Sequence, residues 1–249
     1  MFPMRILLVA AAFSAAIGQT QSNAALDGAK PQLSAETRGD IYMARKMYRE
    51  AIETFRQGPA KDPVIQNKIG IAYHQMTQLD AARKYYEQAI RLKPDYMEAI
   101  NNLGTVYYGK KSYRRAISVY RRALRVAPED TRSASIYMNL GTAYFARKNY
   151  DQASEAYQTA LRLDPDVFEH HGNFGVMLEE RSVEERAKFH FYLAKLYAKE
   201  GRNELALQYL RKALEEGYKD KKLADTPEFA TIRELPEFKE IMAREPRVL

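Results

Sequence analysis

One stretch of the chain, GTVYYGKKS at 104–112, differs at one position from a nucleotide-binding loop. That loop has a glycine, four residues, a second glycine, a lysine and then a serine or threonine. Gly104, Gly109 and Lys110 fit the pattern, but Lys111 occupies the position of the hydroxyl residue. Whether these residues bind phosphate depends on the element that contains them, because such a loop connects a strand to a helix.

Other residue types that perform chemistry are few or poorly spaced. The chain has no cysteine, which excludes disulfides, thiolate metal ligands and a cysteine nucleophile. The patterns HExxH, GxSxG and GxGxxG do not occur. Among the four histidines, His170 and His171 are adjacent, so on a helix they would point in different directions. We therefore predict no enzyme, no catalytic residue, no metal site and no cofactor.

A repeated pattern accounts for the glycine at position 104. Four stretches, at 38–63, 66–94, 101–128 and 136–165, align with one another. In each, a glycine is followed by a tyrosine after 3 residues, an alanine after 12, an aromatic residue after 16 and a proline after 24. The glycines are Gly39, Gly70, Gly104 and Gly141, and the aromatic residues are Phe55, Tyr86, Tyr120 and Tyr157. Two of the sister stretches have this glycine without any Gly-Lys pair, so we predict no nucleotide site.

These positions resemble the tetratricopeptide repeat, a helix–turn–helix unit of about 34 residues. The resemblance implies an all-α fold, a superhelix or α-solenoid of about five to six antiparallel helix pairs over residues 33–217. The small residues would let two helices approach closely, and the prolines would end one helix and begin the next. The aromatic positions would fill the space between repeats, which explains 18 tyrosines in a chain without tryptophan.

The regular spacing ends after the fourth copy. A fifth first helix with Gly175 is expected, but the next matching segment, 191–201, comes too early by about the length of one helix. Ser182 and Glu185 form an S-x-x-E capping box. We therefore predict a helix over 183–200 that takes the place of the missing second helix.

The C-terminal segment contains a short duplication. TPEFATI at 226–232 is followed by LPEFKEI at 235–241. Each copy places a proline at the first position of a short helix, with Phe and Ile on one face. We predict that residues 218–249 form a C-terminal cap of short helices over the last repeat, as in some bacterial members of the family. The alternative is a detachable tail that binds a partner.

The N-terminus has the pattern of a secretory signal peptide. Arg5 precedes 13 residues without charge, and Ala16 and Gly18 suit a cleavage site. We predict a signal peptide at 1–18 and a flexible linker at 19–32. The protein is then an exported bacterial type, periplasmic or secreted, or anchored by its N-terminus if uncleaved. No later segment is long and apolar enough to span a membrane, so none is predicted in the mature chain.

The resemblance also suggests a peptide site, because ligands of this family usually lie in the concave groove lined by the first helices. A row of asparagines is expected to face this groove, where an amide can pair with a peptide backbone because it both donates and accepts. The alternative is that asparagine before Leu-Gly belongs to the repeat itself. The predicted peptide-binding residues are Lys68, His74, Asn101, Asn102, Thr105, Tyr108, Asn139, Thr142, Phe145 and Asn173.

A second candidate surface is the basic stretch 110–125, which contains no acid. Its cations are Lys110, Lys111, Arg114, Arg115, Arg121, Arg122 and Arg125. Such a stretch is most often a solvated helix face. Alternatively it contacts an anionic partner, which a net charge of +7 would favour. Nucleic acid fits an exported protein poorly.

Two functions follow from these patterns. The first is a non-enzymatic protein–protein interaction scaffold of the bacterial envelope, which binds a protein or peptide in its concave groove. The second is an adaptor that binds anionic envelope polymers, lipids or acidic proteins through residues 110–125. The sequence does not identify the partner in either case.

Overall fold

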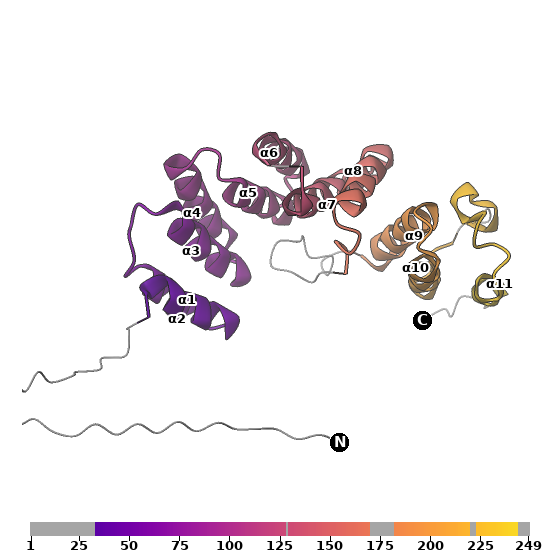
Figure 1. Cartoon of the computed structure of the whole chain (residues 1–249), viewed down its shortest axis with the longest axis horizontal. Helices are drawn as coiled ribbons and strands as arrows, with labels where there is room; N and C mark the ends of the chain where they lie inside the picture. The colour runs from indigo at the N-terminus through magenta and orange to yellow at the C-terminus, as the bar shows by residue number, and fades with distance from the viewer. Residues whose placement is uncertain (1–32, 128, 170–181, 220–222, 244–249) are drawn as a thin grey trace, which may run out of the picture. The chain divides into compact units, whose positions relative to one another are not determined.

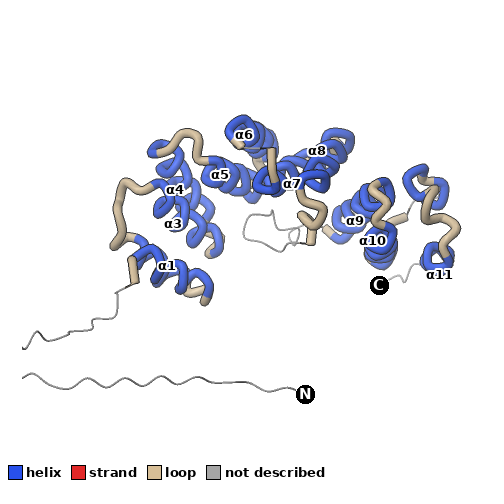
Figure 2. Tube along the Cα trace, viewed as in Figure 1, coloured by secondary structure: helices blue, strands red, loops and turns tan. Residues whose placement is uncertain are grey.

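The computed structural model describes residues 33–127, 129–169, 182–219 and 223–243. These ranges contain eleven α-helices, two short 3-10 helices and no strand (Figures 1 and 2). The α-helices are α1 (Ala35–Ala44), α2 (Tyr48–Phe55), α3 (Pro63–Gln75), α4 (Leu79–Leu92), α5 (Met97–Gly109), α6 (Tyr113–Val126), α7 (Thr131–Ala146), α8 (Tyr150–Leu163), α9 (Val183–Lys199), α10 (Asn203–Glu215) and α11 (Pro236–Ala243). The 3-10 helices are η1 (Leu223–Asp225) and η2 (Pro227–Phe229). The predicted all-α fold is confirmed.

The first ten helices form five pairs. Each odd-numbered helix packs against the helix that follows it, and each even-numbered helix contacts the next odd-numbered one. The turn inside each pair is only a few residues long, as between Gly109 and Tyr113, so the two helices run antiparallel. We call the first helix of each pair its A helix and the second its B helix. The predicted signal peptide 1–18, the predicted linker 19–32 and the predicted helix with Gly175 lie outside the described residues.

The contact between a glycine and an aromatic ring holds the two helices of a pair together. At Gly70, a Cβ atom would lie 2.6 Å from a ring carbon of Tyr86, and at Gly104 it would lie 2.4 Å from one of Tyr120. Such distances are shorter than any van der Waals contact between carbons. The glycine is therefore required for close approach, and the ring that covers it is fully buried. The four rings with this role are Phe55, Tyr86, Tyr120 and Tyr157.

The turns from A helix to B helix share one backbone feature. A residue with positive φ follows the end of the A helix in all five pairs; in the third pair it is Lys111, with φ 56°. The amide of this lysine donates to the carbonyl of Tyr108 at 2.7 Å and so ends α5. The residues with positive φ are Lys46, Thr77, Lys111, Lys148 and Gly201. Because Gly104 lies inside α5 and no strand precedes it within the described residues 33–103, GTVYYGKKS is not a phosphate-binding loop.

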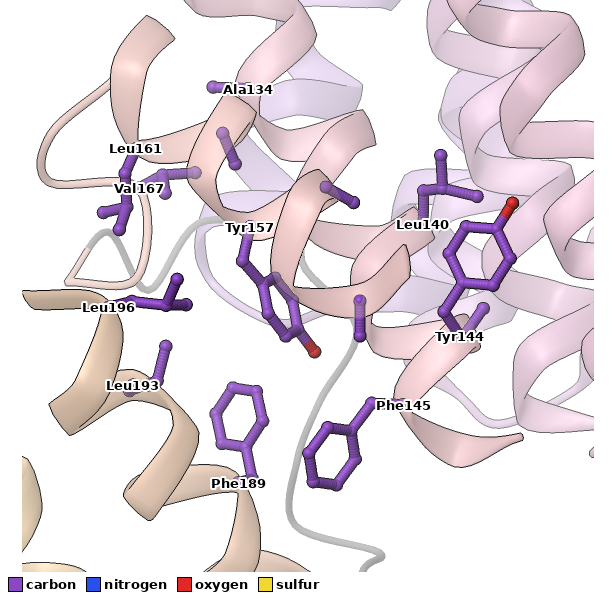
Figure 3. Packing of buried hydrophobic residues seen from close by; sticks show 14 of the residues in the cluster. Ala134, Leu140, Tyr144, Phe145, Tyr157, Leu161, Val167, Phe189, Leu193 and Leu196 are labelled. Atoms are coloured by element: carbon purple, nitrogen blue, oxygen red, sulfur yellow. The ribbon is translucent and has the colours of Figure 1, made fainter. Parts of the chain in front are cut away.

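Two clusters of buried side chains form the core of the paired helices. The smaller one joins α1, α2 and α3, and the larger one extends from α4 to α11. In the larger cluster the ring of Tyr157 points toward Phe189 of α9, with ring centroids 5.7 Å apart in an edge-to-face arrangement (Figure 3). Phe145 lies beside Phe189 at 5.7 Å. These rings connect the fourth pair to the fifth although the spacing of the sequence is irregular there.

The last A helix begins as the capping box predicts. The amide of Glu185 donates to the Ser182 hydroxyl at 3.2 Å, and the amide of Ser182 donates to the Glu185 carboxylate at 3.4 Å. The helix that follows, α9, runs from Val183 to Lys199 and pairs with α10. The predicted helix over 183–200 is therefore confirmed.

The C-terminal segment packs on the fifth pair. In this region η2 contacts α9, and α11 contacts α10. The ring of Phe191 in α9 stacks on Tyr218 at 4.2 Å and meets Phe229 edge-on at 5.8 Å. In the first copy of the duplication the helix is a single 3-10 turn, and in the second it is α11. The Phe and Ile residues of both copies are buried, namely Phe229, Ile232, Phe238 and Ile241.

Candidate functional site

The predicted asparagine row lies on the A helices, where it links neighbouring repeats. Asn102 of α5 donates from its side-chain nitrogen to the Asn67 oxygen of α3 at 3.0 Å. Asn139 of α7 donates to the Asn101 oxygen of α5 at 3.2 Å. The two adjacent asparagines of α5 therefore reach in opposite directions, one to each neighbouring A helix. We call these four residues the asparagine ladder.

The ladder side chains are buried, although the sequence predicts that they face the groove. Asn101 and Asn102 are 3% and 4% exposed, and Asn139 is fully buried. A buried amide is stable only when its hydrogen-bonding groups have partners, and here each amide supplies the partner of another. Little of these side chains is therefore accessible at the groove that the sequence predicts them to face.

Two predicted threonines extend this buried polar layer. Thr105 donates to the backbone carbonyl of Asn102 at 2.8 Å. Thr142 donates to the carbonyl of Met138 at 2.9 Å and accepts from the Tyr157 hydroxyl at 3.2 Å. Like the ladder, both side chains are buried and form contacts within the chain. Predicted Phe145 is also buried, at 4% exposure, among the rings that join α7 to α9.

Three predicted residues stay partly exposed. Lys68 lies between Glu36 and Asp40 of α1, with its nitrogen 2.7 and 2.6 Å from their carboxylate oxygens. Burial alone would lower the pKa of Lys68, but these hydrogen bonds raise it above its ordinary value. Burial lowers the pKa of His74, whose Nδ1 lies 3.5 Å from the Thr105 hydroxyl. The imidazole is therefore neutral near pH 7.

Tyr108 is the third partly exposed residue of the predicted set. It lies one helical turn after Thr105 on α5 and contacts the ring of Tyr113 at 5.2 Å. Asn173 lies outside the described residues. The accessible part of the predicted site therefore consists of Lys68, His74 and Tyr108, beside a polar layer used for packing.

The predicted basic stretch divides into two groups. Three of its seven cations contact other repeats. Lys110 pairs with Asp80 at 2.6 Å, and Arg122 donates to the carbonyl of Pro94 at 3.1 Å. Arg121 donates to the Tyr144 hydroxyl of α7. These contacts join repeats, so these three side chains do not form a free basic surface.

The remaining cations of the stretch are exposed. Lys111, Arg114 and Arg115 lie at the start of α6, where an open depression also receives Arg147 from the next turn. Arg125 lies at the opposite end of the helix. Arg147 was not among the predicted residues, although it precedes Lys148 just as Lys110 precedes Lys111. This pair of cations at the same point of two repeats was the available signal.

The described residues offer no other constellation for chemistry. Within them, no cluster of three or more His, Asp or Glu residues is arranged to hold a metal ion. No helix in the same ranges has the length and apolar character needed to cross a membrane. Other partly buried polar pairs join helices, as in the contact between His190 Nδ1 and a Glu216 carboxylate oxygen at 2.7 Å.

The stacked helix pairs define the class of this chain as an α-solenoid built from helical repeats. Three family models, each described as a tetratricopeptide repeat or TPR repeat, match residues 70–111, 95–166 and 138–220. Together they span more than half of the 249 residues. The chain belongs to the tetratricopeptide repeat family.

Several curated proteins are similar over part of the chain. The uncharacterized protein ycf37 of Guillardia theta is 30% identical over 95 residues, which are 35% of this chain and 53% of that protein. The chloroplastic tetratricopeptide repeat domain-containing protein PYG7 of Arabidopsis thaliana is 29% identical over 99 residues, 37% of this chain and 33% of PYG7. This chain thus spans about half of the first relative and about a third of the second.

The solved structures that are similar to this chain include MamA, residues 41 to the end, from Desulfovibrio magneticus RS-1, with 22% sequence identity and a TM-score of 0.50. The match covers 73% of this chain and 92% of that one. At this identity the likeness shows the fold alone.

Proposed function

We propose that this protein is a scaffold that binds a segment of a partner protein across its A helices. Tetratricopeptide repeats are protein-interaction modules, and this chain belongs to that family. The observation that carries the proposal is the division of roles on the A helices. The buried asparagine ladder fixes the spacing of α3, α5 and α7, and partly exposed polar and aromatic side chains lie beside it.

The chemistry of the exposed side chains suits a peptide segment. Tyr108 offers an aromatic face and a hydroxyl, which is a common combination at protein interfaces. A neutral imidazole at position 74 both donates and accepts hydrogen bonds, so it can pair with a peptide amide or carbonyl. These groups lie on helices that the ladder joins, and a site whose parts are held in place loses less entropy on binding. A partner would meet preformed positions.

The test is recovery of crosslinked partners from cells that express the tagged protein. The variant H74A Y108A should no longer recover the partner that the natural protein recovers. Its free energy of unfolding should match that of the natural protein. The matched control is Gln152→Ala, a substitution of an exposed residue on the B helix α8. It should recover the partner fully. Equal recovery by H74A Y108A and the natural protein would refute the assignment to the A helices.

A second function is favoured by the exposed cations at the start of α6. We propose that they attach the protein to an anionic partner, such as an acidic protein, an envelope polymer or lipid headgroups. The supporting observation is that Lys111, Arg114 and Arg115 are exposed and form no ion pair with another described residue. Binding should weaken as ionic strength rises, because exposed charges are screened. Binding that does not respond to salt would reject this function.

Export to the envelope remains a proposal that rests on the sequence of residues 1–18. N-terminal sequencing of the protein isolated from cell fractions tests it. A chain that begins after Gly18 in an envelope or secreted fraction is expected. A full-length chain in the cytoplasmic fraction would contradict export.

A further inference from the structure

An open depression lies where the A helix turns into the B helix in the third and fourth pairs. Its volume is about 530 Å³, and it is lined by Lys111, Ser112, Tyr113, Arg114, Arg115 and Arg147. Arg147 follows the end of α7, whereas the other five residues surround the start of α6. The depression is therefore lined by four cationic side chains that come from two successive repeats.

These four cations are not neutralised by the part of the chain that the structure describes. All four residues are exposed, and none forms an ion pair with a described carboxylate. The first turn of α6 also has no acid, whereas α2, α4 and α8 have Glu50, Asp80 and Asp151 there. An acid at this position offsets the positive end of the helix dipole. The positive potential at the depression is consequently uncompensated.

The acids on the opposite loops do not make a second copy the obvious partner. Asp62 and Asp130 accept backbone hydrogen bonds at the starts of α3 and α7. Asp166 pairs with Arg202 at 2.7 Å. These three carboxylates already have internal partners, and docking a second copy on them would cost those contacts.

The extent of the basic surface favours a short ligand. The turn of the second pair, residues 76–78, has no cation, and the turn of the fifth begins with Glu200. A long polyanion or a flat membrane would engage cations over more repeats. Three of the four cations are arginines, whose planar guanidinium groups bind carboxylates with two parallel hydrogen bonds. The ligand that fits best is an acidic peptide of a few residues.

We propose that this depression binds a short acidic segment of a partner protein, an inference that rests on the second function above and names its partner. The carboxylates of that segment would pair with Arg114 and Arg115 from one repeat and Arg147 from the next. A ligand that binds residues of both repeats would also stabilise the contact between these repeats.

Fluorescence anisotropy with a fluorescein-labelled hexaglutamate peptide tests the proposal at about 0.15 M salt. The variant R114E R147E should bind the peptide about tenfold more weakly or worse, because exposed like charges now repel it. The control R91E R211E changes the net charge equally at exposed residues outside the depression. It should bind within about threefold of the natural protein, since distant charges are screened at about 0.15 M salt. Circular dichroism confirms that both variants fold.

Two results would overturn the proposal. One is failure of the natural protein to bind hexaglutamate, or an equal loss in the two double variants. The other is stronger binding to phosphatidylserine vesicles or to an oligonucleotide, lost in R114E R147E, which would assign the depression to a different partner. Failure here is distinguishable from failure of the scaffold function, because recovery of the A-helix partner depends on His74 and Tyr108 instead.

Discussion

Replacing Gly104 with alanine tests the contact that joins the two helices of a pair. The added Cβ atom would lie 2.4 Å and 2.6 Å from two ring carbons of Tyr120, which is fully buried. An ordinary carbon–carbon contact is about 3.5–4.0 Å, so the ring must move by about 1 Å or the helices must separate. Overpacking of this kind costs about 1–3 kcal/mol.

Part of that cost is offset because alanine favours a helix interior over glycine by about 1 kcal/mol. An overlap of about 1 Å places the overpacking cost in the upper part of its range, about 2–3 kcal/mol, so we expect Gly104→Ala to lower the free energy of unfolding by about 1–2 kcal/mol. The matched control is Gly109→Ala at the end of the same helix, where the new atom would lie 3.2 Å from a flexible methyl group of Leu79. That substitution should be neutral or slightly stabilising.

Urea unfolding followed by circular dichroism measures both changes. Since repeat proteins can unfold in parts, the slope of the transition must match that of the natural protein before the free energies are compared. A second background, Tyr120→Leu, removes the ring. Gly104→Ala should be far less costly there, and an equal cost in both backgrounds would refute the role assigned to the ring. So would a Gly104→Ala protein as stable as the Gly109→Ala protein.

Three further predictions concern polar groups that are buried or partly buried. Asn102→Ala should cost about 1–3 kcal/mol in urea unfolding, because it leaves the Asn67 oxygen buried without a donor; a neutral result would contradict the ladder. Tyr120→Phe should cost nothing, because this hydroxyl has no partner among the described residues, whereas Tyr157→Phe should cost about 0.5–1.5 kcal/mol. Burial lowers the folded pKa of His74 below its unfolded value of about 6.5, so the unfolded state binds more protons in acid and stability is lost as pH falls below about 6.5. Unfolding measured across that range should show a shallower loss for His74→Gln; identical pH profiles would refute the assignment.

The packing of each pair could be predicted from the sequence because its cause is local. Gly104 and Tyr120 are 16 residues apart, and one helix–turn–helix unit brings them together without help from other repeats. The capping box at Ser182 has the same character, since both of its hydrogen bonds join residues three apart. The start of α9 was therefore predictable even where the spacing of the repeats failed.

The candidate site was less predictable because it depends on neighbouring repeats. Helical periodicity placed Asn101 and Asn102 on the face away from the paired helix but did not show what the next A helix places against them. Asn67, one residue before the predicted Lys68, was not recognised as a ladder partner. Arg121 and Arg122 likewise find their partners in adjacent repeats. The sequence of one repeat does not show which residue of the adjacent repeat a charged side chain will contact.

Binding of a partner protein on the A helices can be tested most directly by photo-crosslinking. A photo-crosslinking amino acid is placed at position 108 of the full chain, and living cells are irradiated. The account predicts a discrete crosslinked product with a partner protein, because the partly exposed Tyr108 lies on the A-helix surface assigned to binding. The same amino acid at position 152, exposed on the B helix α8, should give no such product. Equal products from both positions, or a product from position 152 alone, would contradict the claim.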